Sequence, residues 1–128
     1  MPNTIFSIVE SAYRATVEEQ DDPALWFTAA VKNAGGDIAL LLRANAVNYA
    51  VKGQDASDLA IGGAGSRHPP DLAADLQRML YSGVTLYVLA EDVIDRGIPT
   101  SQLIDGIHLI KREALPKLMS QFDQIWHW

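Results

Sequence analysis

Charged and amide side chains that follow apolar runs are the residues of this chain best suited to chemistry. Three apolar runs, residues 4–9, 38–44 and 84–90, each end in polar groups. The candidate ligand-binding residues are Glu10, Tyr13 and Arg14 after the first run, Arg43, Asn45 and Asn48 at the end of the second, and Glu91, Asp92 and Arg96 after the third. Guanidinium groups bind carboxylate or phosphate through paired hydrogen bonds, so this set predicts a site for an anionic or polar ligand.

Two other interpretations of these residues stay open. Glu91 and Asp92 begin a short predicted helix, where carboxylates are favourable for electrostatic reasons alone. In this interpretation the charged residues pair with one another and cap helices, and they bind no ligand. Glu10 and Glu91 could instead form a general acid–base pair, which requires burial or the neighbouring charge to raise the pKa of one carboxyl group. The sequence shows neither condition.

The residue pattern predicts no metal site and no cofactor. No two of the histidines, His68, His108 and His127, lie close enough in sequence to form a pair of metal ligands. The run "IHLI" places His108 inside a predicted strand, as a core or interface residue. The segment "GGAGSRH", residues 62–68, matches neither GxxxxGK[ST] nor GxGxxG and does not follow a strand, so it predicts a flexible loop rather than a phosphate cradle.

Composition and charge favour a globular domain and disfavour two classes of partner. The chain has 128 residues, which suggests a single domain over residues 1–128, and 48% of them are hydrophobic. A net charge of −6 disfavours nucleic acids and anionic membrane surfaces as partners. The N-terminal residues show no signal-peptide pattern, and no run reaches the roughly 18 apolar residues of a membrane span, so we expect a cytoplasmic protein.

Apolar runs alternate with amphipathic segments along the whole chain. Strands are predicted at residues 4–9, 38–44, 84–90, 107–110 and 123–128, helices within 21–37 and at 45–53, 70–83, 91–97, 98–106 and 112–122, and an irregular segment at 54–69. This order predicts an α/β sandwich with about five mostly parallel strands and helices on both faces. Ligands of such sheets gather beyond the carboxyl ends of the strands, so we expect Glu10, Arg43 and Glu91 at one shared rim.

Local signals refine these elements. Asp22 suits an N-cap and Pro23 the first helical position after it, whereas Pro116 fits a helix only in its first turn. Trp126 and Trp128 fall on the same side of the last predicted strand. Because a strand at the edge of a sheet needs cover, we expect these tryptophans to anchor a subunit interface rather than to plug the core.

The segment "SGVTLYVLAEDVIDRGIPTSQLIDGIHLI", residues 82–110, resembles the DsrE/DsrF-like family, which includes TusD and YchN-type proteins. The likeness rests on a "GV" strand, a short helix, an Arg–Gly step and an L-I-x-G-I ending, found here at Gly83–Val84, Leu86–Leu89, Arg96–Gly97–Ile98, Leu103, Ile104, Gly106 and Ile107. Taken with the order of elements, it extends over about residues 4–127. The resemblance implies a DsrE-like fold, assembly as a trimer or hexamer, and sulfur relay through a cysteine persulfide after the "GV" strand.

The residue that carries sulfur in that family is missing. By the family's spacing, the cysteine would fall at Leu89 in TusD-like proteins or at Asp92 in YchN-type proteins, and this chain contains no cysteine anywhere. A persulfide needs a thiolate carrier, so sulfur transfer by this chain alone is excluded. We therefore expect a non-catalytic, oligomeric binding or assembly protein, and the resemblance implies a link to sulfur metabolism through cysteine-bearing partners. The alternatives are a binder of small anionic ligands and an enzyme that uses carboxylates.

Overall fold

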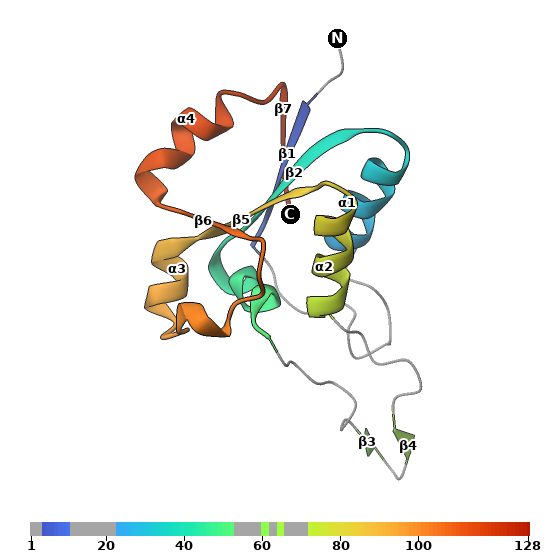
Figure 1. Ribbon diagram of the computed structural model, residues 1–128, viewed down its shortest axis with the longest axis vertical. Helices are drawn as coiled ribbons and strands as arrows, with labels where there is room; N and C mark the ends of the chain where they lie inside the picture. The colour runs from blue at the N-terminus through green and yellow to red at the C-terminus, as the bar shows by residue number, and fades with distance from the viewer. Residues whose placement is uncertain (1–3, 11–22, 53–59, 62–63, 66–71) are drawn as a thin grey trace.

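A parallel sheet of five strands forms the centre of the fold (Figure 1). The computed structural model describes residues 4–10, 23–52, 60–61, 64–65 and 72–128. The strands are β1 (Thr4–Val9), β2 (Asp37–Leu42), β5 (Thr85–Leu89), β6 (His108–Ile110) and β7 (Gln124–His127). Their order across the sheet is β6-β5-β2-β1-β7, and every neighbouring pair is parallel. The predicted α/β class is confirmed.

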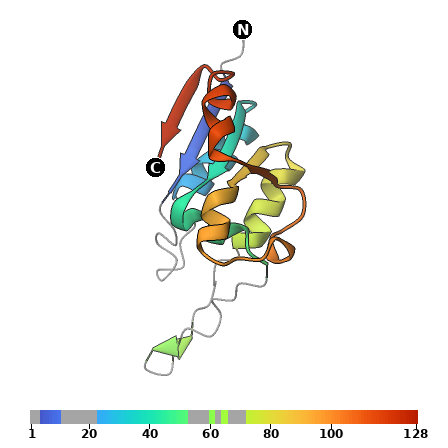
Figure 2. The ribbon, with the colours of Figure 1, turned by 90° about the vertical axis from the view of Figure 1, so that its left-hand side faces the viewer.

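Helices cover both faces of this sheet (Figure 2). One face carries α1 (Pro23–Asn33), α2 (Leu72–Tyr81) and the 3-10 helix η1 (Ala44–Ala50), and the other carries α4 (Leu115–Met119). The remaining described elements are α3 (Ala90–Asp95), the 3-10 helices η2 (Thr100–Gln102) and η3 (Arg112–Ala114), and an antiparallel pair of short strands, β3 (Ala60–Ile61) and β4 (Ala64–Gly65). None of the described helices has the length and apolarity needed to cross a bilayer.

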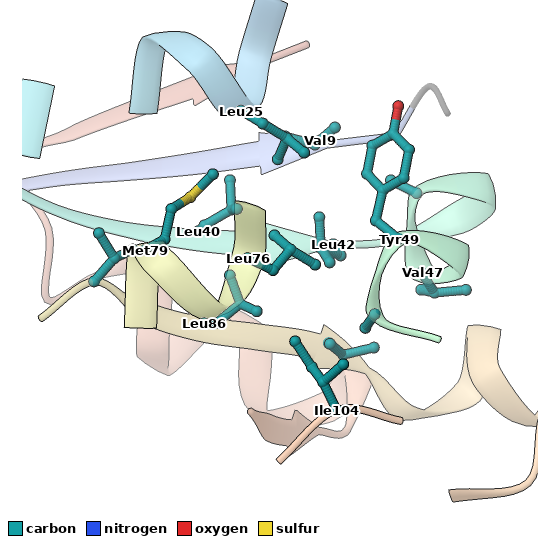
Figure 3. Packing of buried hydrophobic residues seen from close by; sticks show 14 of the residues in the cluster. Val9, Leu25, Leu40, Leu42, Val47, Tyr49, Leu76, Met79, Leu86 and Ile104 are labelled. Atoms are coloured by element: carbon teal, nitrogen blue, oxygen red, sulfur yellow. The ribbon is translucent and has the colours of Figure 1, made fainter. Parts of the chain in front are cut away.

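Alternate residues of the strands enter two separate core clusters. Leu40 and Leu86 pack with Leu76 of α2 in the larger cluster (Figure 3), whereas Leu41 lies in the smaller cluster with Leu115 of α4. All of these side chains are buried. Because the central strands are covered on both faces, they need apolar residues at successive positions, which explains the continuous apolar runs of the sequence.

Two predicted segments differ from the structure for identifiable reasons. Residues 98–106, predicted as a helix, form only the three-residue turn η2, because Leu103 leaves it to bridge Val51 and the Ile104 amide donates to the Ala50 carbonyl. Residues 54–69, predicted to be irregular, contain the pair β3 and β4. The predicted N-cap Asp22, His68 and most of the segment 62–68 lie outside the described residues.

His108 was predicted to be a core or interface residue, and the core placement was wrong, whereas the interface placement stays a prediction. Its side chain is exposed, and its ring lies 5.7 Å from the ring of Tyr87. The reason is that β6 is an edge strand of only three residues, so an apolar run there does not imply burial on both faces. By contrast, Pro116 does lie in the first turn of α4, as predicted.

Candidate functional site

The carboxyl ends of the parallel strands form a rim of polar side chains. Glu10 follows β1, Arg43 follows β2, and Glu91 lies two residues after β5. Because the three strands are parallel and β2 lies between the other two, their carboxyl ends meet at one edge of the sheet, as expected. Of the remaining candidates, Tyr13 and Arg14 lie outside the described residues.

At one end of the rim, Glu10 joins three strands through its carboxylate. Its Oε1 atom lies 3.2 Å from Arg43 Nε and 3.0 Å from His127 Nε2, and the contact with His127 is an ion pair only when the imidazole is protonated. The Glu10 backbone is also fixed, since its amide donates to the Trp128 carbonyl and its carbonyl accepts from the Ala46 amide. This carboxylate is held by neighbours on both sides.

The Arg43 guanidinium is attracted to Glu10 without being optimally aimed at it. Its Nε atom is shielded from solvent, and within the described residues its N–H makes no hydrogen bond despite the short distance to Glu10. The side chain as a whole is 38% exposed. The pair therefore rests on Coulomb attraction at a partly solvated surface, where ion pairs contribute little to stability.

At the other end of the rim, Asp92 is the centre of a denser network. Its Oδ2 atom accepts a 2.7 Å hydrogen bond from the Ala44 amide, and its Oδ1 atom lies 3.5 Å from Arg112 Nη2 and 3.9 Å from Arg96 Nη1. Only 8% of the residue is exposed. The carboxylate thus links the start of η1 to α3 and η3.

The bond from Ala44 has a particular structural role. Ala44 has a φ of 51°, in the left-handed region that favours glycine. A residue other than glycine held there costs on the order of 1 to 3 kcal/mol, so its surroundings must offset that strain. The charged acceptor Asp92 does so at the point where the chain leaves β2 and begins η1.

Glu91 has a comparable but more exposed role. Both of its carboxylate oxygens accept from the Arg112 backbone amide, at 3.0 and 2.9 Å, and so cap the start of η3. The capping interpretation of the two acids therefore describes their observed contacts, although the caps are on η1 and η3 rather than on α3 itself. Among the described residues no hydrogen bond or shared partner joins Glu10 to Glu91, and β2 separates their strands.

The remaining predicted candidates support this network. Arg96 Nη2 donates a 3.0 Å hydrogen bond to Asn45 Oδ1, and Asn48 Nδ2 donates to the Asn45 carbonyl at 2.8 Å. In the described part of the chain, no three His, Asp or Glu side chains converge as metal ligands. The expectation that the chain binds no metal remains a prediction.

Sequence reasoning missed Arg112 and His127 as members of the rim. Both sit at the carboxyl ends of the outer strands, Arg112 after β6 and His127 at the end of β7. The rule that located the other candidates would have found them if it had been applied to the exits of all five strands.

The two positions implied for the family cysteine have different surroundings. Leu89 is fully buried in the smaller core cluster, where a thiol would have no contact with solvent or with a partner protein. Asp92 lies at the rim, beside Arg112, whose side chain is 58% exposed. Both positions are thus largely buried, but Asp92 is 8% exposed whereas Leu89 has no exposed surface.

Solved structures with this fold are known. The YchN protein from E. coli has a TM-score of 0.73 and 18% sequence identity, and the match covers 100% of both chains. A conserved protein of unknown function from Bacteroides thetaiotaomicron has a TM-score of 0.68 and 16% identity over 98% of this chain and 95% of that one. A protein of unknown function from Methanobacterium thermoautotrophicum has a TM-score of 0.60 and 13% identity over 98% and 99%.

These likenesses concern the fold. No model of a known protein family matches the chain, and no curated protein matches its sequence. The expected resemblance to YchN-type proteins is therefore confirmed for the fold, whereas sulfur relay, assembly state and ligand remain predictions.

Proposed function

We propose that this chain is a non-catalytic binding or assembly protein with a YchN-like fold, which associates with itself and does not carry sulfur. The observation that supports the proposal best is the set of contacts made by the Asp92 carboxylate. At one of the two positions where the resemblance implies a persulfide cysteine, the one with YchN-type spacing, the chain has a largely buried carboxylate that binds the Ala44 amide and lies near two arginines.

Chemistry at this position supports a structural role. A carboxylate cannot form a persulfide, and the chain contains no thiol that could act instead. The contacts of Asp92 hold three segments of the chain together. In the proposed function, the rim of the sheet therefore binds a partner or ligand and does not transfer sulfur. Any link to sulfur metabolism then depends on cysteine-bearing partner proteins, which we propose as the second class of partner after the chain itself.

Incubation with a persulfide donor followed by intact-protein mass spectrometry tests the absence of sulfur transfer. We expect the wild-type chain to gain no sulfur atom, because no thiolate is present. We expect Asp92→Cys to gain one, because its thiol would lie beside Arg96 and Arg112, and nearby cations favour the thiolate.

Leu89→Cys is the matched control. Its thiol would replace a fully buried side chain, so we expect no sulfur uptake by the folded protein, as judged by circular dichroism before the reaction. Stable sulfur uptake by the wild-type chain would overturn the proposal. Uptake by Leu89→Cys but not by Asp92→Cys would show that position 92 is not the one open to a donor.

A second candidate function, binding of a small anion, is favoured by one observation. Arg96 and Arg112 both approach a single oxygen of Asp92, at 3.9 and 3.5 Å. Charge-assisted hydrogen bonds are normally about 2.7–2.9 Å long, so neither guanidinium group is used fully by this carboxylate. Arg96 also donates to Asn45 and to the Asp92 carbonyl, whereas Arg112, with 58% of its side chain exposed, has the more accessible donors for a second acceptor. A phosphate or carboxylate group fits this donor set.

Thermal unfolding with added inorganic phosphate tests the anion site. A ligand at 100 times its dissociation constant stabilises a protein by about 2.7 kcal/mol, so saturation should raise the melting temperature measurably. We expect Arg112→Ala to lose most of that increase and the neighbouring Lys111→Ala to keep it, since Lys111 is exposed and has no contact with Asp92 among the described interactions. An equal increase in the melting temperature of both variants would show that Arg112 does not bind the phosphate.

A further inference from the structure

The strand β7 lies at one end of the five-stranded sheet. β7 pairs with β1 on one side, and among the described residues no strand pairs with its other side. Figure 2 shows β7 as the outermost strand, beside β1. Sheet edges are commonly protected by lysine, proline or a bulge, and β7 has the sequence Gln-Ile-Trp-His, which contains no lysine or proline.

The direction of the β7 backbone groups follows from its bonds to β1. The backbone N–H and C=O groups of Trp128 both point toward β1. Its amide donates to the Ile8 carbonyl at 2.8 Å, and its carbonyl accepts from the Glu10 amide at 3.2 Å. Alternate residues of a strand direct their backbone groups to the same side, so Trp126 also bonds inward. Ile125 and His127 therefore direct their N–H and C=O groups away from the sheet.

A hollow lies along this same edge. It has a volume of about 450 Å³ and is lined by Phe27 of α1 and by Ile125, Trp126, His127 and Trp128. The Phe27 ring centre lies 5.2 Å from that of Trp126 and 5.7 Å from that of Trp128, so the wall of the hollow is aromatic. Ile125 is 41% exposed, which leaves apolar surface beside the free backbone groups.

From these features we infer that β7 binds a second copy of the chain, edge to edge, through an antiparallel β7–β7 pair. One register satisfies every outward group. If the twofold axis passes beside Trp126, Ile125 faces the partner's His127, and each residue donates to and accepts from the other, as hydrogen-bonded antiparallel pairs do. The two Trp126 side chains then become close neighbours, about 4.5 Å apart at Cα, in the intervening non-hydrogen-bonded pair.

Symmetry and the absence of charged side chains from β7 favour a second copy as the occupant. The chain has a net charge of −6, so two copies repel one another over most approaches, whereas β7 itself contains no Asp, Glu, Lys or Arg. A twofold contact requires one patch to complement itself, and the alternation of outward backbone groups at Ile125 and His127 does so. The inference specifies the surface of the self-association in the proposed function and rests on it.

Sedimentation velocity over a dilution series, with an Ile125→Pro variant, tests the edge. Proline removes the outward N–H of residue 125 but no bond to β1, and edge strands tolerate proline at such positions. We expect at least about a 10-fold increase in the dimer dissociation constant, because symmetry removes a hydrogen bond in each copy. The control Ile125→Val keeps the N–H and the β-branched shape and should associate like the wild-type chain.

Disulfide formation between two single variants tests the register. The chain has no cysteine of its own, so Ile125→Cys and His127→Cys can be mixed under oxidised glutathione. Residues that face one another in a hydrogen-bonded antiparallel pair are about 5.5 Å apart at Cα, within disulfide range. We expect the mixture to form a covalent dimer of the two variants, whereas either variant alone, with its cysteines offset by two residues, should form little.

The outcomes separate the edge from the proposed function. An oligomer that Ile125→Pro leaves unchanged would overturn the β7 edge and leave self-association standing. A wild-type chain that stays monomeric up to high micromolar concentration would overturn both. Crosslinks in each variant alone, as abundant as in the mixture, would overturn the register and indicate another alignment of the two β7 strands.

Discussion

Replacing Asp92 with alanine is expected to lower the free energy of unfolding by about 3 kcal/mol. The substitution removes the charged acceptor of the Ala44 amide and leaves Arg96 and Arg112 without their shared carboxylate. Ala44 then keeps its left-handed backbone without the bond that holds it there. Urea unfolding followed by tryptophan fluorescence measures the loss, since the chain has three tryptophans.

Two further variants decide whether the loss comes from this contact. Asp95→Ala removes an exposed carboxylate from the same helix and should change stability by less than about 0.5 kcal/mol. Ala44→Gly removes the cost of the left-handed backbone at a side chain, so in the Asp92→Ala background it should restore about 1 kcal/mol. If Asp92→Ala is no worse than Asp95→Ala, the rim network does not contribute to the fold.

The strand pattern was predictable because both faces of the central strands are covered. Residues 38–42 are apolar at successive positions, and that pattern is typical of strands buried on two sides. The same reasoning failed at His108, because β6 has only one strand neighbour and its side chains reach solvent. The pattern of apolar residues therefore indicates whether the side chains of a strand are buried only when the position of that strand in the sheet is known.

The rim was predictable in position but not in detail. The carboxyl ends of parallel strands meet at one edge whatever their sequence, so Glu10 and Arg43 could be placed together before the structure was known. The bond from Ala44 to Asp92 could not be predicted, since it joins residues 48 positions apart and depends on a positive φ at an alanine. Nothing local in the sequence marks that conformation.

The site and the fold depend on one another at this edge. The carboxylate of Asp92 is committed to backbone and arginine contacts. The proposed binding surfaces are therefore two others, which are the exposed donors of Arg112 at one side of the sheet and, among the described residues, the unpaired edge of β7 at the other.

Replacing Phe6 with alanine is expected to cost about 4 kcal/mol, the largest effect among the variants considered. Phe6 is fully buried in the smaller core cluster, with ring centres 4.9 Å from Phe122 and 6.1 Å from Tyr87. The helix α4 that covers this cluster has only five residues, too few to form a stable helix without packing. Loss of the ring should therefore also loosen α4.

Hydrogen exchange and urea unfolding together test this dependence. In Phe6→Ala, the amides of α4 should exchange faster by a larger factor than those of α2, which packs on the opposite face. Phe6→Leu fills most of the same volume and should cost less than half as much. If α2 and α4 gain exchange equally, unfolding is global and α4 does not depend locally on Phe6. If Phe6→Ala costs under about 1 kcal/mol, the cluster has refilled the cavity, and this face of the sheet tolerates far more rearrangement than close packing implies.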